Sequence, residues 1–380
     1  MDGISLRGTP STAVPYSPID VRSFAQRLGS WLHPNGPDAD VVVSCRVRLA
    51  RNVRGFPFSP RLDADRAREV CELLRRHLVG AALDGETIWV PMPDSPVVLR
   101  LLLRERHLIS TDLAPLEASS ASLAGRAVAF GERETLSAMV NEEDHLRIQA
   151  MSAGFDLDDA WEQARALDRR LEQDMPFSFT KELGYLTGCP TNVGTGLRAS
   201  VMLHLPALSL VRSELEKVFT AAQRTGLAVR GMYGEGSRAA GDFYQISNQI
   251  TLGRTESHLI DDLRALVPVI VDFERTVRKA LLDDQRAALQ DRVSRSYGML
   301  RTARAMPTEG ALAHLSNVRL GLHLGLFDGA PLQVLNALGV QVQRGHVQAL
   351  NAVDGGPDLL EVSERDRLRA GLLRQRLSGR

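Results

Sequence analysis

The chain has 380 residues, of which 44% are hydrophobic and 24% are charged, and its formal net charge is zero. This length favours one large or two ordinary domains, and the balanced charge excludes a protein-wide basic field for nucleic acid. Only Lys181, Lys217 and Lys279 are lysines, so nearly every cation is an arginine. Biased codon usage is the simpler explanation, although arginine is also the better bidentate partner for phosphate.

The three cysteines, Cys45, Cys71 and Cys189, are far apart and form neither a Cys-x-x-Cys pair nor a zinc-ligand spacing. Their odd number argues against a disulfide framework. The sequence contains no run of 18 apolar residues and no apolar core of a signal peptide. We therefore expect a cytoplasmic protein that binds no membrane, no nucleic acid and no metal through its own side chains.

The first 250 residues mix predicted strands with predicted helices. Residues 1–19 are typical of a loose tail. The spacing of apolar residues predicts helices over 21–32, 61–79, 95–107, 157–173 and 213–224, and strands over 41–49, 126–130, 135–140, 146–151, 197–205, 227–233 and 243–247.

After Gly253 the pattern becomes nearly all helical, with breaks at Pro307, Pro331 and Pro357. Strands mixed with helices, followed by helices alone, predict two domains. We expect a tail and a short helix over 1–40, an α+β catalytic domain over 41–275, and an all-helical C-terminal domain over 276–380. The catalytic domain should contain a mixed or mainly antiparallel sheet flanked by helices.

The run Ser44-Cys-Arg-Val-Arg48 carries two arginines at alternate positions of a predicted strand. Side chains alternate between the two faces of a strand, so Arg46 and Arg48 should lie on the same face. Two guanidinium groups that point one way form a phosphate clamp. A solvated strand face is about equally good as an explanation of this run alone.

The link Asn141-Glu-Glu-Asp-His-Leu-Arg147 packs three carboxylates, a histidine and an arginine between two predicted strands. Carboxylates this close together repel one another unless a cation lies among them. A charged turn is the commoner explanation, but the position between two apolar strands favours a functional loop.

Cys189 lies in an irregular Cys-Pro-Thr-Asn segment that leads through Arg198 into an apolar strand. A thiol in such a loop, beside an arginine, indicates a site rather than a scaffold. A thiolate there would help to orient and polarise a guanidinium group.

Two further runs are weaker signals. Residues 230–237 end a strand in a glycine-rich loop with one carboxylate, Glu235, and such a loop can close over a substrate. It is not a Walker A loop, and an ordinary surface loop is the alternative. Arg104, Arg106 and His107 end a predicted helix, where cations suit the helix dipole.

Together these runs explain one reaction. A chain without a P-loop lysine can neutralise a nucleoside triphosphate only with arginines, here Arg46, Arg48, Arg147, Arg198 and Arg230. The acceptor should then be cationic and held by carboxylates such as Glu143 and Glu235. A guanidinium keeps its proton above pH 12, so phosphoryl transfer to it requires a positioned carboxylate base and in-line alignment.

The chain resembles the phosphagen kinases, because five motifs, at 44–48, 141–147, 189–195, 198–202 and 230–235, occur in the order of that family. The resemblance implies ATP and Mg²⁺ as cofactors, guanidinium binding and base function from Glu143 and Glu235, and Cys189 as the reactive thiol. The nucleotide contacts that it implies are Ser44, Arg46, Arg48, His107, Arg147, Arg198, Ala199, Ser200, Val201, Met202, Arg230, Gly231 and Gly234.

Two features are closer to the bacterial protein arginine kinases (the McsB family) than to creatine and arginine kinases. Only 43 residues precede Ser44, so we expect no N-terminal domain that caps a small substrate, and a helical C-terminal domain follows the catalytic motifs. Such an open site fits a protein acceptor, since a small ligand usually needs burial on most sides.

The segment Arg365-Asp-Arg-Leu-Arg-Ala370 resembles the phosphoarginine-binding motif of that family. The resemblance implies phosphoarginine contacts from Arg365, Asp366, Arg369 and Ala370, with both arginines on one helix face. A basic helix end is the alternative explanation.

The resemblance also implies protein substrates with exposed arginines, a homodimer formed through the helical domain, an activator protein, and a Clp ATPase or protease that degrades the marked proteins. Two other functions stay open: a kinase for a small guanidino compound, and a non-catalytic adaptor that binds phosphoarginine. The intact Glu143, Cys189 and Glu235 argue against the adaptor.

Overall fold

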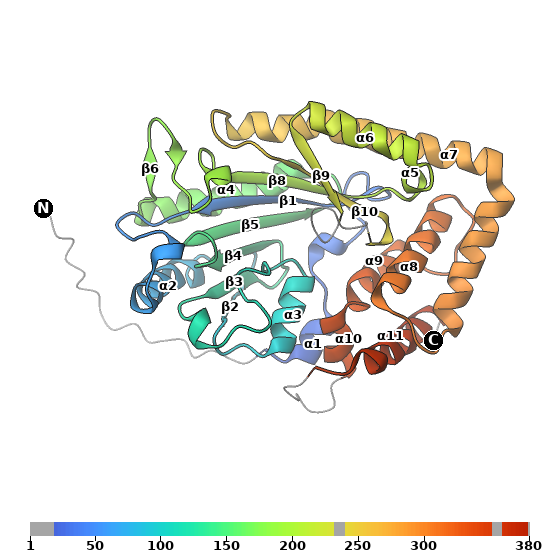
Figure 1. The fold of residues 1–380 in the computed structure, drawn as a ribbon, viewed down its shortest axis with the longest axis horizontal. Coiled ribbons are helices and arrows are strands. Elements are labelled where there is room, and N and C mark those ends of the chain that lie inside the picture. Colours follow the sequence, from blue (N-terminus) through green and yellow to red (C-terminus); the bar gives the residue numbers. More distant parts are fainter. Residues whose placement is uncertain (1–18, 232–239, 352–358, 379–380) are drawn as a thin grey trace, which may run out of the picture.

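The computed structural model describes residues 19–231, 240–351 and 359–378, and Figure 1 shows their arrangement. An eight-stranded sheet forms the centre of this part of the chain, in the order β2-β3-β4-β5-β1-β8-β10-β9. Every neighbouring pair in it is antiparallel. The strands are β1 (Val42–Arg51), β2 (Thr87–Pro91), β3 (Ala127–Gly131), β4 (Leu136–Val140), β5 (Leu146–Ala153), β8 (Leu197–His204), β9 (Leu227–Gly231) and β10 (Phe243–Asn248), and a separate hairpin consists of β6 (Phe179–Thr180) and β7 (Gly184–Tyr185).

One face of the sheet is apolar and packs on helices. Cys45, Val47 and Leu49 of β1 are fully buried in this core. The helices that bury this face are α2 (Ala64–Val79), α4 (Leu157–Asp174), α6 (Arg212–Arg224) and the first half of α7 (Glu256–Thr302). The alternation of apolar and polar residues along the strands therefore separates the core from the opposite, polar face.

The second face of the sheet is covered over only part of its width. Helix α3 (Val97–Glu105) packs Leu99 and Leu102 on Val128 and Phe130, beside α1 (Val21–Gln26) and the short 3₁₀ helix η1 (Ser30–Leu32). The rest of this face, from β5 to β9, carries the polar residues described below.

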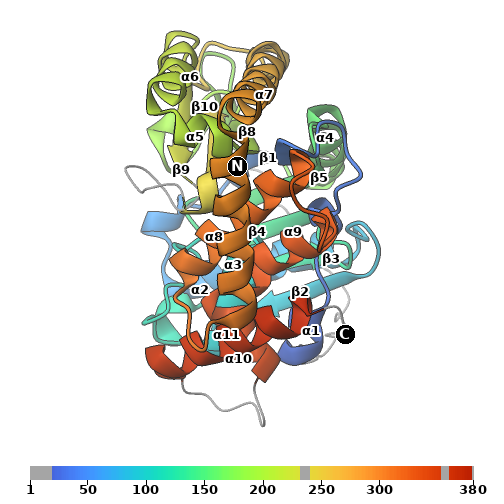
Figure 2. The same cartoon turned by 90° about the vertical axis from the view of Figure 1, so that its right-hand side faces the viewer.

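The C-terminal helices form a second cluster beside the sheet, as Figures 1 and 2 show. They are α8 (Thr308–His323), α9 (Leu332–Gln341), α10 (Arg344–Asn351) and α11 (Val362–Leu377). A short helix, α5 (Pro206–Leu210), contacts α6, α7 and α8. Leu300, Leu312, Leu338 and Leu373 belong to the core of this cluster.

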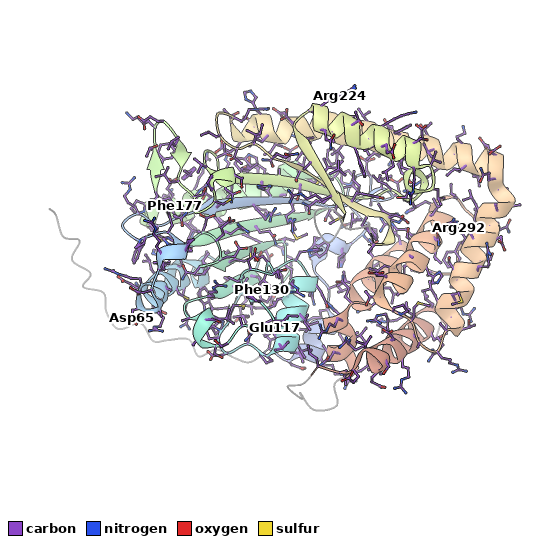
Figure 3. All side chains as sticks on the ribbon, in the orientation of Figure 1. Asp65, Glu117, Phe130, Phe177, Arg224 and Arg292 are labelled. Atoms are coloured by element: carbon purple, nitrogen blue, oxygen red, sulfur yellow. The ribbon has the colours of Figure 1, made fainter. Side chains whose placement is uncertain are left out.

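Helix α7 connects the two parts. It begins after Thr255, whose side chain accepts a hydrogen bond from His258 N, and its only non-helical backbone is at Gln285, with φ −132°. The predicted domain boundary at 275/276 falls inside this helix. Figure 3 shows the usual distribution of side chains around both parts, with Phe130 and Phe177 inside and Asp65, Glu117, Arg224 and Arg292 at the periphery.

The local signals explain where α2 lies. Asp63 caps its first turn by accepting from Arg66 N at 2.8 Å, and Val70, Leu74 and Leu78 recur every four residues on its buried side. The predicted start at residue 61 was therefore too early, because the extended Leu62 and the cap residue Asp63 follow it.

Most predicted elements are confirmed with ends shifted by a few residues, but one predicted helix was wrong and several short elements were missed. The predicted helix 21–32 breaks after Gln26 into α1 and η1, because Arg27 and Gly29 have extended backbone. Strand β2, helix α5 and the hairpin of β6 and β7 were missed. Within the part of the chain that the structure describes, every helix lacks the length or the apolar character needed to cross a membrane.

Candidate active site

The polar face of the sheet brings together the arginines that the sequence singled out. Arg48 of β1 lies opposite Arg198 of β8, and Arg46 lies two residues earlier on the same strand. On the other side of β1, Ala50 pairs with Arg147 of β5. Directly paired residues of antiparallel strands point to the same side, so all four guanidinium groups share one face. The predicted common face of Arg46 and Arg48 is confirmed.

Two of the expected nucleotide contacts face the other way. The side chains of Ala199 and Val201 are fully buried in the core on the opposite face of the sheet. Only their backbone is left to approach a ligand on the polar face. Ser200 and Met202 alternate with them and point toward the site, where both line a cavity.

Arg147 lies between two carboxylates of the acidic loop, as the sequence predicted for a cation. Its Nη1 is 2.7 Å from Glu142 Oε2, and its Nη2 is 2.7 Å from Glu143 Oε2. The Glu142 side chain is buried and also accepts from the Ser110 hydroxyl, whereas the Glu143 side chain is 38% exposed. Glu142 therefore orients Arg147, and Glu143 remains open to an incoming cation.

The next two residues of this loop have a structural role. Asp144 Oδ1 accepts from Gly188 N at 2.6 Å. His145 Nδ1 accepts from Val53 N at 3.0 Å, and its Nε2 donates to the Pro57 carbonyl at 2.8 Å. These two bonds define a neutral imidazole, and burial lowers the pKa of His145 in agreement. Both side chains hold neighbouring segments against the acidic loop.

The Cys189 segment approaches the arginines through a single 3₁₀ turn. Cys189 Sγ lies 3.1 Å from Thr191 Oγ1. Arg198 donates to Thr191 Oγ1 and to Asn192 Oδ1, each at 3.3 Å. Thr251 Oγ1 donates to the Thr191 carbonyl at 3.0 Å and so holds the turn in place. Thr191 and Asn192 were not predicted as site residues, although they belong to the same Cys-Pro-Thr-Asn motif.

The arginines of the site repel one another. Burial, followed by the charge of Arg147, lowers the pKa of Arg46 to about 10. Burial, followed by the neighbouring guanidinium groups, lowers the pKa of Arg48 well below its usual value, and burial with Arg230 lowers that of Arg198. Among the described residues Arg48 Nε has no hydrogen-bond partner. A bound polyanion would offset both the repulsion and the unpaired donor.

These groups line one cavity of about 260 Å³. Its lining residues are Arg48, Ala50, Glu143, Arg147, Cys189, Thr191, Asn192, Gly196, Arg198 and Arg230. The cavity therefore combines an exposed carboxylate, a thiol and four guanidinium groups.

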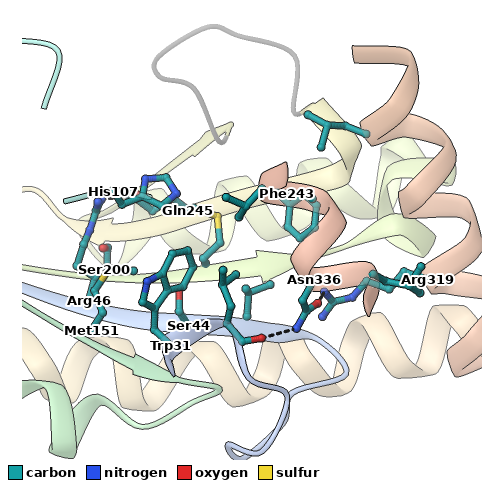
Figure 4. A pocket seen from close by; sticks show the side chains of 17 residues that line it. Trp31, Ser44, Arg46, His107, Met151, Ser200, Phe243, Gln245, Arg319 and Asn336 are labelled. Carbon is teal, nitrogen blue, oxygen red and sulfur yellow. Dashed lines mark hydrogen bonds between the residues drawn. The ribbon is translucent and has the colours of Figure 1, made fainter. Parts of the chain in front are cut away.

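A second cavity, of about 50 Å³, lies farther along β1, where Arg46 lines it (Figure 4). Besides Arg46, four expected nucleotide contacts line it: Ser44, His107, Ser200 and Met202. Burial, followed by the charges of Arg46 and Arg48, lowers the pKa of His107 to about 3, so its ring is neutral. This second cavity is mostly apolar, whereas the arginines of the first cavity suit phosphates.

Residues without any sequence motif complete the second cavity. Trp31 comes from η1, and Asn336 of α9 donates to the Leu32 carbonyl at 3.0 Å, as drawn in Figure 4. Gln245 of β10 accepts from Arg46 Nη2 at 2.8 Å. Sequence analysis missed these residues because their contacts join segments far apart in the chain.

The glycine-rich loop is only partly described. Arg230 lies on β9 opposite Gln245 of β10, and Gly231 is the last residue of β9. Gly234 and Glu235 lie outside the described residues. The expected base function of Glu235 stays a prediction.

Arg106 was misinterpreted from the sequence as a helix-end cation. It is buried, pairs with Glu134 at 2.8 Å, and donates to the Phe24 carbonyl at 2.6 Å. It thereby joins α1, α3 and the β3–β4 turn. Its neighbour His107 has a positive φ of 59°, which turns the chain at the end of α3 beside the second cavity.

The expected phosphoarginine motif lies on α11, but Arg369 has a structural role there. It is 2% exposed, and it donates to the Val342 carbonyl at 2.5 Å and to the Met306 carbonyl at 2.8 Å. It also pairs with Asp366 at 2.6 Å. Arg369 thus connects the α7–α8 loop with the end of α9.

Arg365 is the more accessible arginine of this motif. It is half-buried and donates to the Leu360 carbonyl. Burial, followed by the charges of Arg344 and Arg369, lowers its pKa, which places three cations close together. Ala370, by contrast, is buried in the helical core.

Comparisons with known proteins show the family of this chain. Residues 81–277 match the family model of the ATP:guanido phosphotransferase C-terminal catalytic domain, and residues 286–380 match that of the protein-arginine kinase McsB C-terminal domain. The chain belongs to the protein-arginine kinase family. The protein-arginine kinases of Halothermothrix orenii and Moorella thermoacetica are each 42% identical over 93% of this chain and over 97% and 99% of their own lengths. That of Symbiobacterium thermophilum is 43% identical over 92% of this chain and 96% of its own length.

Solved structures show the same fold in the catalytic part. Taurocyamine kinase from Schistosoma mansoni, with bound transition-state-analogue components, has a TM-score of 0.57 and 27% identity over 66% of this chain and 35% of its own. Lombricine kinase has a TM-score of 0.55 and 27% identity over 68% of this chain and 72% of its own. The predicted phosphagen-kinase-like domain, followed by helices, is confirmed.

Proposed function

We propose that this protein transfers the γ-phosphate of ATP to the guanidinium group of arginine side chains in other proteins. The observation that carries the proposal is the single cavity in which the open carboxylate of Glu143 and the thiol of Cys189 face four arginines. Its relatives over nearly the whole chain are protein-arginine kinases.

In the proposed reaction the arginine cluster binds the triphosphate and the smaller cavity takes the adenosine. An Nη atom of the acceptor attacks the γ-phosphorus, the bond to the β–γ bridging oxygen breaks, and ADP leaves. Glu143 accepts the proton that the attacking nitrogen loses. Cys189, in the same cavity, would hold another nitrogen of the guanidinium, and Glu142 keeps Arg147 aligned with the phosphates.

Mg²⁺ would accompany ATP in this proposal. Among the described residues no group of three or more His, Cys, Asp and Glu side chains could hold a metal ion. Phosphate oxygens and water usually supply most ligands of Mg²⁺ in such sites, so the residues present fit an ion carried by the nucleotide.

The proposal also includes a second site and a cellular context. The cations Arg344 and Arg365 would contact a phosphoarginine on the C-terminal helices, with Arg369 as a structural support. The protein would act in the cytoplasm as a homodimer, with an activator protein, and would mark proteins for a Clp-type protease.

A kinase for a small guanidino compound is the competing function, because two solved relatives are taurocyamine and lombricine kinases. Incubation with ATP and a panel of purified proteins, compared with free arginine, separates the two. We expect acid-labile phosphate on protein arginines and little turnover of millimolar free arginine. Efficient turnover of free arginine, with unmodified proteins, would move the assignment to the small-molecule kinase.

A further inference from the structure

A groove adjoins the catalytic cavity across the Cys189 segment. It has a volume of about 570 Å³ and is lined mainly by Phe56, Pro57, Phe58, Pro60, Ser178 and Gly188. Gly188 lines this groove, and the next residue, Cys189, lines the catalytic cavity. The two cavities therefore adjoin at the Gly188–Cys189 peptide.

The wall between the two openings is held rigidly. His145 Nε2 donates to the Pro57 carbonyl at 2.8 Å, and its ring lies edge-on to Phe56 at 6.3 Å. A Cβ atom on Gly188 would lie 2.5 Å from the Glu143 carbonyl oxygen, so only glycine fits between the groove and the catalytic loop. A ligand in the groove would thus sit at a fixed distance from Glu143.

The groove is lined by apolar side chains that are only partly buried in the protein core. Phe56 and Phe58 are half-buried, and Phe58 belongs to none of the hydrophobic clusters of the described residues. Pro57 and Pro60 restrict the backbone of this segment, so little ordering is required when a ligand binds. The exposed Arg61 adds a positive charge to the lining. The groove suits an aromatic or aliphatic side chain and disfavours a cation.

Exposed apolar residues also flank the Cys189 segment on both sides. Half of the eight large hydrophobic residues that are exposed in the described chain lie on two neighbouring segments, namely Phe179, Leu183, Ile250 and Leu252. Gly194 connects these segments, because it pairs with Tyr185 N at 2.8 Å and its Cβ position lies 2.5 Å from the Thr251 carbonyl. Exposed apolar residues gathered on two neighbouring segments indicate a binding surface.

We propose that this groove binds an aromatic or large aliphatic side chain of the acceptor protein, two or three residues from the target arginine. An extended segment advances about 3.3 Å per residue, so two or three residues can span two cavities that adjoin at the Gly188–Cys189 peptide. The proposal rests on the proposed function and narrows its acceptor class to arginines with an apolar neighbour.

The test uses the full-length protein, Mg-ATP and acceptor peptides that contain one arginine among serines and glycines. A phenylalanine is placed in turn at each position within three residues of the arginine. We expect kcat/KM to rise about tenfold at one position, the scale of one apolar contact in a pocket. Lysine at that position should lower it. Phe58→Ser should reduce the gain to less than about twofold, and Arg61→Ala should relieve the penalty for lysine.

Val269→Ser is the matched control, since Val269 is 63% exposed on α7 and lies in neither opening. It should keep the full preference, and both serine variants should keep the KM for ATP. The groove proposal would be overturned if the protein without substitutions phosphorylated all peptides at equal rates, or if its preference survived Phe58→Ser. If neither peptides nor proteins accept phosphate while free arginine does, the proposed function fails, and the groove proposal fails with it.

Discussion

Glu105 at the end of α3 caps the first turn of α10 next to His346. Its Oε1 accepts from Gly345 N at 2.6 Å, and its Oε2 accepts from His346 N at 3.0 Å and from His346 Nδ1 at 2.8 Å. Both side chains are buried. Two residues after Glu105, His107 lines the smaller cavity of the active site. One turn of chain therefore connects the C-terminal helices with the proposed adenosine site.

Glu105→Gln should weaken this connection. The variant loses the charge that the two backbone N–H groups face, and a loss of about 1–3 kcal/mol in the free energy of unfolding is expected for such bonds. The KM for ATP should rise several-fold with kcat nearly unchanged, since the arginine cluster is intact. Urea unfolding and steady-state kinetics measure both. Glu309→Gln, at an exposed position of α8, is the control. An unaltered KM for ATP in the Glu105 variant would show that the C-terminal helices do not influence the proposed adenosine site.

Glu143→Gln should abolish most of the chemistry without disturbing the fold. The side chain is 38% exposed, and its amide keeps the shape of the carboxylate. Turnover should fall on the order of a hundredfold or more, the usual scale for a positioned base, while ATP affinity changes little. Single-turnover phosphorylation and ATP titration test this. Glu142→Gln should instead weaken ATP binding through Arg147, so equal effects of both variants would contradict the assigned roles.

Substitutions of Arg369 and of Arg365 should affect different properties: the first should lower stability, and the second should weaken phosphoarginine binding. Arg369→Ala removes the donor from two buried carbonyls and should cost roughly 3 kcal/mol in the free energy of unfolding. Arg365→Ala should cost less than about 1 kcal/mol, since this arginine makes one backbone contact. It should nevertheless weaken phosphoarginine binding about tenfold or more, the scale for a lost charge-assisted bond, and leave ATP binding intact.

Calorimetric titration of phosphoarginine and ATP into both folded variants provides the measurement. Arg198→Ala is the reciprocal control, because it should weaken ATP binding and leave phosphoarginine binding unchanged. Normal phosphoarginine affinity in the Arg365 variant would show that the motif is only a basic helix end.

The free energy of unfolding should decrease as the pH falls below about 6.5. Burial is the main cause that lowers the pKa values of His107 and His323 to about 3, whereas an unfolded histidine titrates near 6.5. Between these values the unfolded state binds more protons, so each residue removes about 1.4 kcal/mol per pH unit as the pH falls. Above pH 6.5 the contribution is complete and constant. Urea unfolding at several pH values should show a shallower slope for His107→Gln, and an identical slope would contradict the buried neutral ring.

The catalytic face was predictable because its signals are local. The alternation that places Arg46 and Arg48 together is a property of one strand, and the pairing of Arg147 with Glu142 and Glu143 joins residues within one short loop. When polar residues occupy every second position of an otherwise apolar strand, the polar face can be predicted without knowledge of distant contacts.

The failures concern contacts between distant segments. Arg106 resembles a helix-end cation, but its acceptors are a carbonyl and a carboxylate far away in the chain, which no local pattern reveals. Strand β2 was missed because it ends in Pro91, which argues against a strand in a sequence. Proline is tolerated there because β2 is an edge strand.

Helix α7 contributes to two cores at once. Leu263 and Ile270 are buried under the sheet, and Leu300 is buried among the C-terminal helices. Without the C-terminal helices, the second half of α7 would lose its packing partners. Without α7, which begins after Thr255, the core under the sheet would be exposed to solvent. The molecule should therefore melt in a single cooperative transition, and neither half should persist alone after the other has unfolded.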